Sequence, residues 1–399
     1  MNTLFEPGGI VEKDFIPLCV PHVMGNEWKY IKECLDSNWV SSTGPYVDRF
    51  EKVIAEKIGL PFAVATTNGT AALHLTLLAL GIETNDEVVT STLTFIAPVN
   101  AIRYMNAHPV LIDADLDTWQ MDIKKVEEFL LKHCAKNARG DLINKVTGRR
   151  VSALMPVHIL GGAVDMDPIL ELARQFDLPI IEDATEALGT KYRGKMAGSL
   201  GDAACFSFNG NKLITTGGGG MIVTGREDWA KRCKYLSTQA KDDPLEYIHN
   251  AVGYNYRLSN IQAAMGVAQL ENLDKYIQAK RKIAKRYEAN LGDIPGITLM
   301  PTGSQVFNTF WMYTILIDEK TAGISSRQLL KKLFDAKIQA RPLWQPMHCS
   351  PVYSNAYHVG GGNAELLNQT ALSLPCSVGI TEKEQERVIE VIHRSVKRK

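Results

Sequence analysis

The feature that most constrains the fold is a repeated alternation of short apolar segments with helical patterns between residues 62 and 224. The apolar segments lack polar residues at every second position, so they predict strands that are buried on both faces. The segments between them carry apolar residues at helical spacing. Such repeated units predict an α/β fold in which a mostly parallel sheet is covered by helices on both faces. The expected strands span residues 62–65, 87–91, 109–113, 152–157, 179–181, 203–208 and 221–224, and the expected helices span residues 69–80, 98–104, 122–134 and 168–176.

The remaining patterns predict a second, smaller domain. Before the alternation, Trp28, Ile31 and Leu35 lie on one face of an expected helix over residues 26–36, and another helix is expected over residues 45–58. After an expected helix at 227–237, a helical pattern without proline runs from Ser259 to Leu291 and stops at Gly292. The expected organisation is therefore a large domain with an N-terminal segment (1–258), one long connecting helix (259–292) and a small C-terminal α/β domain (293–399). Strands are expected in the last part at 311–317 and 338–341, with helices at 326–336 and from residue 381 onward.

Charge and cysteine usage exclude several classes of protein. Lys plus Arg and Asp plus Glu both number 44, so no net field attracts nucleic acid or an anionic membrane. The seven cysteines are scattered without a CxxC pair, which argues against a disulfide framework or a zinc site, and we expect no metal. No apolar run is long enough to span a bilayer, and the start of the chain lacks a signal pattern. These observations predict a cytoplasmic enzyme without nucleic-acid or membrane partners.

The segment from Gly201 to Thr224 contains the most suggestive reactive residue. Lys212 lies between two expected strands, followed by the four glycines 217–220. Desolvation disfavours an ammonium, so a lysine in this position can present a nucleophilic amine. The glycines permit positive φ angles and close approach of backbone or ligand. The alternative is a hairpin with an exposed lysine at its tip.

Three other features fall just after strands, where the ligands of such sheets bind. Asn68, Gly69 and Thr70 open a helix and can seat a phosphate on its free N–H groups, although an ordinary helix cap has the same sequence. The pair Glu182-Asp183 closes an apolar strand; it could hold a cationic ring nitrogen, a metal ion or a buried ion-pair partner.

The third feature is an aromatic residue. Phe95 follows the strand over residues 87–91 and can stack on a planar ring or pack in the core. Ser207, upstream of Lys212, adds a hydroxyl group. A phosphate seat, an aromatic face, a carboxylate and a lysine amine together match the requirements of pyridoxal phosphate (PLP). Each signal is weak alone, and their occurrence in this order on one α/β domain is much stronger.

These residues carry a resemblance to a known family. The segments NGTAAL at 68–73, TFIA at 94–97, EDATEALG at 182–189, SFNGNK at 207–212 and GYNYRLS at 253–259 resemble the DegT/DnrJ/StrS family of PLP-dependent nucleotide-sugar aminotransferases. The resemblance extends from about residue 16 to the final helix. It implies the aspartate-aminotransferase type of fold (PLP fold type I).

The resemblance also implies roles for individual residues. Lys212 would hold the cofactor as a Schiff base and shuttle a proton, while Asp183 would pair with the pyridine nitrogen. Phe95 would stack on the ring. The residues expected to hold the phosphate are Gly69, Thr70 and Ser207. Glu186 falls where relatives often place Gln or His near the phenolic oxygen, which a carboxylate should repel.

Further positions match substrate and subunit contacts of the family. Asn255 would reach the phosphate of the neighbouring subunit, which implies a homodimer with shared active sites. Arg257 would meet the nucleotide phosphates, with a salt bridge at a helix start as the alternative. Arg341 and His348 lie in the segment where relatives contact the sugar nucleotide; a structural role is equally compatible with His348.

The resemblance predicts a reaction. Family members that dehydrate sugars replace the lysine by histidine, whereas this chain keeps Lys212. We therefore expect transfer of an amino group, with L-glutamate as donor, to the 4-keto carbon of a nucleotide-linked 4-keto-6-deoxy sugar. The motif over residues 16–42 is most similar to the branch that supplies 4-amino-4,6-dideoxy sugars for legionaminic-type glycans of bacterial surfaces. The alternatives are a PLP-dependent sugar dehydratase and a non-catalytic sensor of PLP or sugar nucleotide.

Overall fold

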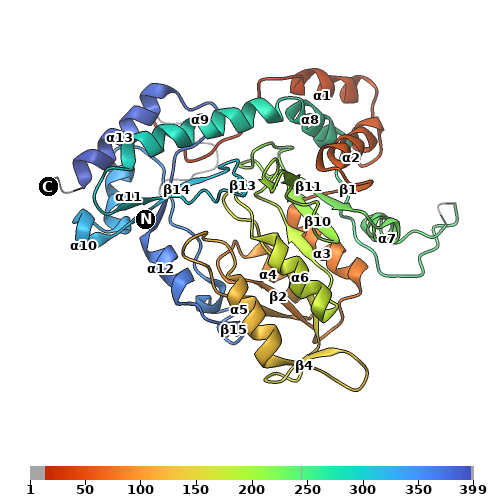
Figure 1. Cartoon of the computed structure of the whole chain (residues 1–399). Helices are drawn as coiled ribbons and strands as arrows, with labels where there is room; N and C mark the ends of the chain where they lie inside the picture. Colours follow the sequence, from red (N-terminus) through yellow and green to blue (C-terminus); the bar gives the residue numbers. More distant parts are fainter. Residues whose placement is uncertain (1–13, 244, 397–399) are drawn as a thin grey trace.

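The computed structural model describes residues 14–243 and 245–396, in which a large mixed sheet with helices on both faces is followed by a smaller sheet with its own helices (Figure 1). The large sheet combines two four-stranded sheets, in the orders β1-β11-β10-β7 and β6-β2-β3-β15. Parallel bridges from Leu154 to Ile180 and from Val157 to Asp183 join β6 to β7. Its strands are β1 (Phe62–Thr66), β2 (Glu87–Ser91), β3 (His108–Ile112), β6 (Val151–Met155), β7 (Ile181–Asp183), β10 (Ala203–Ser207), β11 (Gly220–Thr224) and β15 (Tyr357–Val359).

The expected mostly parallel sheet is confirmed. Only β11 runs antiparallel to its neighbours β1 and β10, while the other paired strands are parallel. One face packs on α3 (Gly69–Leu80), α4 (Ala97–Tyr104) and α7 (Glu227–Ser237). The opposite face packs on α5 (Ile123–Glu128), η1 (Phe129–His133) and α6 (Met166–Phe176). Side chains on both faces of these strands are buried, although those of β1, β10 and β11 that face away from α3 pack in a third cluster with Phe50 and Val267. This burial on both faces explains why the strands are apolar throughout.

The expected long connecting helix is wrong. The chain forms α8 (Asn260–Leu270) and α9 (Leu273–Leu291), separated by a turn at residues 271–272. α8 packs against α1 (Glu27–Asp36) and α2 (Pro45–Ile58), where Gly266 leaves room for the ring of Phe50. α9 then continues toward the C-terminal region (Figure 1). The turn contains no proline or glycine, so the helical pattern passes through it without a visible interruption.

The helix α1 forms as expected, but its core-facing residues are Tyr30 and Cys34. Trp28 is 77% exposed and Leu35 is 51% exposed. The periodic apolar face therefore points away from the fold of this single chain.

The C-terminal region contains a three-stranded antiparallel sheet in the order β12-β14-β16. Residues 338–341, expected as a strand, make only isolated bridges from Ile338 to Ile16 and from Arg341 to Ser373. The elements are β12 (Ile297–Leu299), β14 (Tyr313–Ile317), β16 (Ala371–Leu374), α10 (Glu319–Ala322), α11 (Ser326–Asp335), η2 (Met347–Cys349), α12 (Gly362–Thr370) and α13 (Glu382–Ser395).

Two contacts join this region to the large sheet. β15 pairs in parallel with β3, so the C-terminal part of the chain supplies a strand of the large sheet. Asp113, directly after β3, accepts a hydrogen bond from the Ala364 amide in the first turn of α12 (2.9 Å), and Lys125 lies 3.1 Å from the same carboxylate. A small sheet joins the regions as well, because β13 (Val306–Phe307) pairs with β8 (Lys191–Tyr192), which pairs with β9 (Lys195–Met196).

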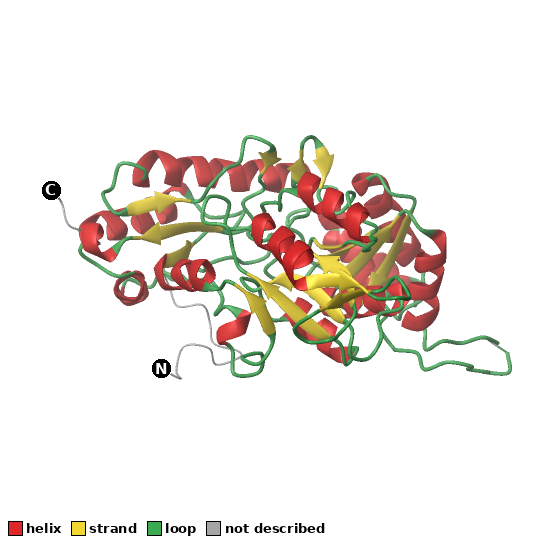
Figure 2. Ribbon diagram, turned by 60° about the horizontal axis from the view of Figure 1, so that its bottom comes forward, coloured by secondary structure: helices red, strands yellow, loops and turns green. Residues whose placement is uncertain are grey.

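The surface excursion over residues 135–150 contains a hairpin of β4 (Cys134–Lys136) and β5 (Leu142–Asn144). Figure 2 shows the strands of the large sheet among their covering helices, with a loop after α7 projecting from the body. Among the described helices, none has both the length and the apolar content required to cross a bilayer.

Candidate active site

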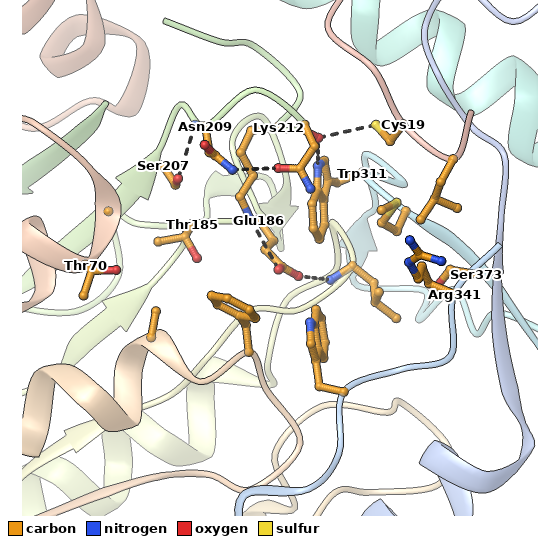
Figure 3. A pocket seen from close by; sticks show the side chains of 18 of the residues that line it. Cys19, Thr70, Thr185, Glu186, Ser207, Asn209, Lys212, Trp311, Arg341 and Ser373 are labelled. Atoms are coloured by element: carbon orange, nitrogen blue, oxygen red, sulfur yellow. Dashed lines mark hydrogen bonds and ion pairs between the residues drawn. The ribbon is translucent and has the colours of Figure 1, made fainter. Parts of the chain in front are cut away.

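A cavity of about 580 Å³ lies between the carboxyl ends of the large sheet and the C-terminal region (Figure 3). This volume suits a small-molecule ligand. Side chains or backbone from both regions line it, so neither region forms the cavity alone. The sequence-predicted residues that line it are Gly69, Thr70, Phe95, Glu186, Ser207, Lys212 and Arg341.

Lys212 lies on the loop between β10 and β11, and its side chain points into the cavity (Figure 3). The side chain is only 14% exposed. Its Nζ atom lies 3.3 Å from Oε1 of Glu186 and 4.0 Å from the centroid of the Trp311 ring. The lysine is therefore held by an anion and an aromatic face, and the alternative of an exposed hairpin tip is wrong.

Glu186 lies beside Lys212 in the wall of the cavity, and its carboxylate faces the lysine amine. Its Oε2 atom accepts a hydrogen bond from the Leu160 amide (3.0 Å), and its side chain is 5% exposed. Burial raises the pKa of the Glu186 carboxyl, although the nearby Lys212 charge acts in the opposite direction. This carboxyl is therefore easier to protonate than an exposed one.

The acidic pair at the end of β7 is divided between two environments. Glu182 is buried on one face, where its carboxylate accepts hydrogen bonds from His158 Nε2 (2.9 Å) and from the amides of Gly198 (2.7 Å) and Gly201 (2.6 Å). Because His158 Nδ1 accepts from the Val164 amide, Nε2 carries the proton. Glu182 thus has a structural role, but its partners are a neutral imidazole and backbone amides, not the cation that the ion-pair alternative requires.

Asp183 points to the opposite face of the strand, toward the Lys212 side. Its side chain is buried behind the cavity wall, and its hydrogen-bond partners are the amide and side chain of Thr185. Burial raises the pKa of the Asp183 carboxyl, because those bonds and the distant charge of Lys212 compensate its desolvation incompletely. A cationic ring nitrogen would supply the missing counter-charge.

The segment predicted to seat a phosphate lies at the start of α3. Asn68 caps the helix by accepting from the Ala71 amide (2.8 Å), which leaves the amides of the first two helical residues for a ligand. A Cβ atom on Gly69 would lie 3.0 Å from Cβ of Ser207 and 3.2 Å from Cγ2 of Thr185. The glycine therefore keeps open a concave space bordered by hydroxyl groups.

The four glycines have different functions. Only Gly217 has a positive φ, of 80°. A Cβ on Gly219 or Gly220 would collide with Thr216 or with the Asn68 backbone, at 2.2 and 2.5 Å. Gly218 and Gly219 also line the cavity. The run therefore serves mainly close packing within the chain, and only part of it borders the ligand space.

Phe95 is 55% exposed and borders the cavity, so it does not pack in the core. Arg341 lines the opposite wall, next to Ser373 with which it forms a backbone bridge. From these positions, Phe95 can contact a planar ring and Arg341 can contact a polar group of the substrate.

Besides Asp183, three predicted residues do not line this cavity. Asn255 forms a backbone bridge with Thr238 at the base of the projecting loop, and Arg257 forms one with Thr66. The Arg257 Nε atom is buried without a hydrogen-bond partner among the described residues. His348 is the third, and its Nδ1 atom lies 2.7 Å from the hydroxyl of Thr92.

His348 has further contacts with a carboxylate and with a second imidazole. Its Nε2 atom lies 3.3 Å from Oε1 of Glu365, and its ring stacks on that of His358. Among the described residues, one group of three potential metal-ligand atoms lies within 4.8 Å of one another, contributed by His348, Cys349 and Glu365.

Trp311 and Cys19 were missed by the sequence analysis. Trp311 packs against Lys212, and its Nε1 atom donates to the Asn211 carbonyl (2.7 Å). Cys19 lies beside the same carbonyl. Both residues are distant from Lys212 in sequence, and no local pattern marks them as pocket residues.

The residues present fit PLP. The open helix terminus with Ser207 suits a phosphate, the buried Asp183 carboxyl suits a cationic ring nitrogen, and Lys212 suits an aldehyde. The exposed Phe95 ring suits a stacked heterocycle.

Comparison with known proteins gives the same answer. The model of the DegT/DnrJ/EryC1/StrS aminotransferase family matches residues 21–393. GDP-perosamine synthase of Caulobacter vibrioides is 42% identical, over 94% of this chain and 97% of that protein. EpsN of Bacillus subtilis is 39% identical over 94% of this chain and 95% of its own length, and its provisional name describes a PLP-dependent aminotransferase.

A solved structure shares the architecture. DesI, crystallised in the presence of its TDP-sugar product, superposes with a TM-score of 0.85 at 29% identity, covering 97% of this chain and 94% of that chain. The family match spans both the large sheet and the C-terminal region, so it includes the lining residues of the cavity other than Leu18 and Cys19. The chain belongs to the DegT/DnrJ/EryC1/StrS aminotransferase family, whose aminotransferases depend on pyridoxal phosphate.

Proposed function

We propose that this protein transfers an amino group from L-glutamate to the 4-keto carbon of a nucleotide-linked 4-keto-6-deoxy sugar, giving a 4-amino-4,6-dideoxy sugar. The observation that carries the proposal is the side chain of Lys212, shielded from solvent and directed into the cavity beside Glu186 and Trp311. A retained lysine amine at this position is what amino transfer requires. The protein would act in the cytoplasm, and its product would be used to build a surface polysaccharide.

When bound, PLP supplies an electron sink that stabilises negative charge on the carbon losing a proton. The chain's own groups hold it and handle the proton. Gly69, Thr70 and Ser207 would bind the phosphate, and Asp183 would keep the ring nitrogen protonated. Lys212 Nζ would bond to the cofactor and, when released by the incoming amine, accept and return a proton.

The remaining contacts concern the substrate. Arg341 lies in the cavity wall, where its guanidinium can bind a phosphate or a sugar hydroxyl. The relative at 42% identity is named for a GDP-linked amino sugar, which favours GDP as the carrier. That name does not support the legionaminic-type pathway suggested by the motif over residues 16–42. We therefore favour a GDP-linked ketosugar as the substrate over a sugar of the legionaminic-type pathway.

A homodimer with shared active sites is part of the proposal. Trp28 and Leu35 on α1 and Trp39 after it are large exposed apolar side chains, and such groups commonly mark protein interfaces. The loop that follows α7 projects from the body in Figure 2 and carries the exposed Leu245 and Val252. Asn255 lies at the base of this loop, so a neighbouring subunit could receive it.

The test begins with the half-reaction. L-glutamate added to the purified holoenzyme should convert the absorbance of the lysine-bound cofactor to that of its amine form. Lys212→Ala should abolish this conversion, whereas Lys275→Ala, which alters an exposed lysine on α9, should leave it intact. Conversion at the wild-type rate in Lys212→Ala would refute the assignment.

The substrate is tested separately. A panel of GDP- and UDP-linked 4-keto-6-deoxy sugars is offered to the amine form, and mass spectrometry identifies the amino sugar. Conversion with glutamate but no aminated product from any member of the panel would leave the aminotransferase chemistry intact and overturn the proposed substrate. A dehydratase would instead release a deoxygenated sugar.

A further inference from the structure

Helix α9 carries a lysine that the proposed reaction does not use. Lys280 is 1% exposed, yet its side chain ends in a charged group. Its Nζ atom donates to the Trp311 carbonyl (2.8 Å) and lies 3.4 Å from Sγ of Cys19 and 3.5 Å from Sγ of Cys376. The two thiols come from opposite ends of the chain and meet at this ammonium.

The charge of Lys280 needs a negative partner. A buried ammonium is costly unless an anion compensates it. None of the ion pairs formed between described residues includes Lys280, and the groups that favour its charged form are the sulfurs of Cys19 and Cys376. One of these two sulfurs is therefore the counter-ion.

The surroundings of the two sulfurs distinguish them. The neighbouring Cys376 thiol and the Lys280 charge lower the pKa of Cys19 to about 6 although burial opposes this. The pKa of Cys376 is raised, so it keeps its proton, which its Sγ atom can donate to the Trp311 carbonyl at 3.5 Å. The 3.4 Å contact of Cys19 Sγ with the Asn211 carbonyl is a hydrogen bond only for the protonated thiol. The ammonium outweighs this neutral contact, because charge-assisted hydrogen bonds are about twice as strong.

Reagents can reach Cys19 from the cavity. Cys19 lines the cavity wall, whereas Cys376 lies behind it at 1% exposure. Of the other five cysteines, Cys34, Cys134, Cys205 and Cys233 are buried and Cys349 lies outside this cavity. The charged sulfur is thus the one that borders the ligand space.

We propose that Cys19 and Cys376 form an oxidant-sensitive modification site in the wall of the active-site cavity. A peroxide oxidises the Cys19 thiolate, which gains one oxygen atom and, after protonation, becomes a sulfenic acid while the peroxide is reduced to water or an alcohol. The Cys376 thiol then attacks the Cys19 sulfur, an S–S bond forms and water leaves. Overall, two thiols and one peroxide give a disulfide and two molecules of water, or one of water and one of alcohol.

The oxidation changes the surroundings of Lys212. The disulfide is neutral, so Lys280 loses its counter-ion and retains only the Trp311 carbonyl among its present partners. Trp311 is the residue whose ring contacts Lys212, and its Nε1 atom binds the Asn211 carbonyl beside Cys19. The site therefore couples the redox state of two thiols to the residues that position the lysine.

The first test measures alkylation of the wild-type holoenzyme by iodoacetamide between pH 5 and 9, with each cysteine followed by peptide mass spectrometry. Because a low pKa also reduces intrinsic nucleophilicity, the decisive readout is the midpoint of the rate profile and not the rate at one pH. We expect a midpoint near pH 6 for Cys19. A midpoint near the ordinary thiol value of about 8.5 would overturn the proposal.

Two variants locate the cause. Lys280→Met should move the Cys19 midpoint upward by at least one pH unit, whereas Lys282→Met, at an exposed position on the same helix, should leave it in place. An unchanged midpoint in folded Lys280→Met would contradict the role of the ammonium. If Lys280→Met does not fold, the wild-type profile and the peroxide experiment still decide the matter.

The second test treats the holoenzyme with stoichiometric hydrogen peroxide. Non-reducing peptide mapping should find the Cys19–Cys376 disulfide, and Cys376→Ser should instead accumulate oxygenated Cys19. The conversion of the cofactor by glutamate should slow several-fold on disulfide formation and recover with dithiothreitol. Preferential oxidation of other cysteines would overturn the proposal. A Cys19–Cys376 disulfide without any effect on the glutamate half-reaction would overturn the coupling of the site to Lys212.

Discussion

The Nζ atom of Lys212 lies 3.3 Å from Oε1 of Glu186, and both side chains are largely shielded from solvent. In the proposed reaction the lysine would bond to the cofactor. The other oxygen of the Glu186 carboxyl accepts a hydrogen bond from the Leu160 amide. Once Lys212 is engaged, Oε1 loses its ammonium partner. Glu186 in its protonated form then offers a hydrogen-bond donor to the cavity, which removes the repulsion expected of a carboxylate beside a phenolic oxygen.

Glu186→Gln tests this interpretation through pH dependence. The pKa of Glu186 is raised by burial, so wild type holds the proton at low pH and loses it as pH rises through that pKa. A glutamine amide donates at every pH. We therefore expect the ratio of variant to wild-type kcat/KM to increase as pH rises through the pKa of Glu186. A ratio that is flat or falls with pH would show that the carboxylate is the active form.

Trp311→Phe separates the ring from its indole N–H. Phenylalanine retains an aromatic face for Lys212 but loses the bond to the Asn211 carbonyl, and it is a weaker cation–π partner. With a cation–π contact worth about 0.5–2 kcal/mol, we expect kcat to fall roughly 2- to 30-fold. KM for glutamate should change less. Trp229→Phe, at a residue on α7 away from the cavity, serves as the control.

Gly69→Ala tests the phosphate seat. The added Cβ would lie 3.0 Å from Cβ of Ser207 and fill the space at the start of α3. We expect the affinity for PLP to fall by at least about tenfold, which corresponds to 1.4 kcal/mol, as measured by titration of the apoenzyme. Gly362→Ala is a matched control, because Gly362 also begins a helix and a Cβ there meets nothing within 4 Å. Equal loss of affinity in both variants would contradict the assignment.

Glu182→Gln tests the structural half of the acidic pair. Burial alone would raise the pKa of Glu182, but bonds from His158 and from backbone amides lower it below its usual value. Its contribution to stability is therefore present above the unfolded pKa of about 4.3 and is lost as pH falls through the lower folded pKa. We expect a loss of about 2–3 kcal/mol in the free energy of unfolding at pH 7.

The destabilisation by Glu182→Gln should shrink as pH falls below about 4, since the wild-type carboxylate then becomes protonated. Chemical denaturation at several pH values measures this trend. Glu171→Gln, at an exposed residue of α6, should have little effect at any pH. A loss that is independent of pH would show that shape, and not charge, decides the contribution of Glu182.

Mixing two inactive variants tests the shared site. Lys212→Ala and Asn255→Ala subunits should regenerate about a quarter of the wild-type activity after random exchange in a symmetric dimer, because half of the dimers are mixed and each has one intact site. Subunit exchange is verified by mass spectrometry of differently labelled chains. Exchange without recovery would place Asn255 and Lys212 of one site on the same chain.

Much of the large sheet could be predicted because its strands are short and apolar and because Asn68, Gly81 and Gly59 mark helix ends by local chemistry. The break between α8 and α9 could not be predicted, since Glu271 and Asn272 are ordinary helix residues and the turn follows from packing. The strand β15 was missed for a similar reason: Tyr357–Val359 is short and half-exposed, and only its pairing with β3 defines it.

The candidate site shows the same division. Lys212, Gly69 and Phe95 lie next to strand ends, so their positions follow from the pattern of the chain. Trp311 and Cys19 reach the cavity from segments whose local sequence says nothing about it. The similarity of its segment to that of relatives predicted that His348 lines the cavity. In the structure the His348 ring contacts Thr92 and lies outside the cavity lining, although Arg341, a few residues earlier, lines it.

The pairing of β15 with β3 and the capping of α12 by Asp113 have a consequence for motion. An opening of the cavity by a swing of the whole C-terminal region would have to break a parallel strand pair and expose a buried carboxylate. Such a swing is therefore unfavourable. Exchange of a bulky sugar nucleotide must instead rely on local movements at the mouth, so the rate of product release should depend on loop residues and not on a domain hinge.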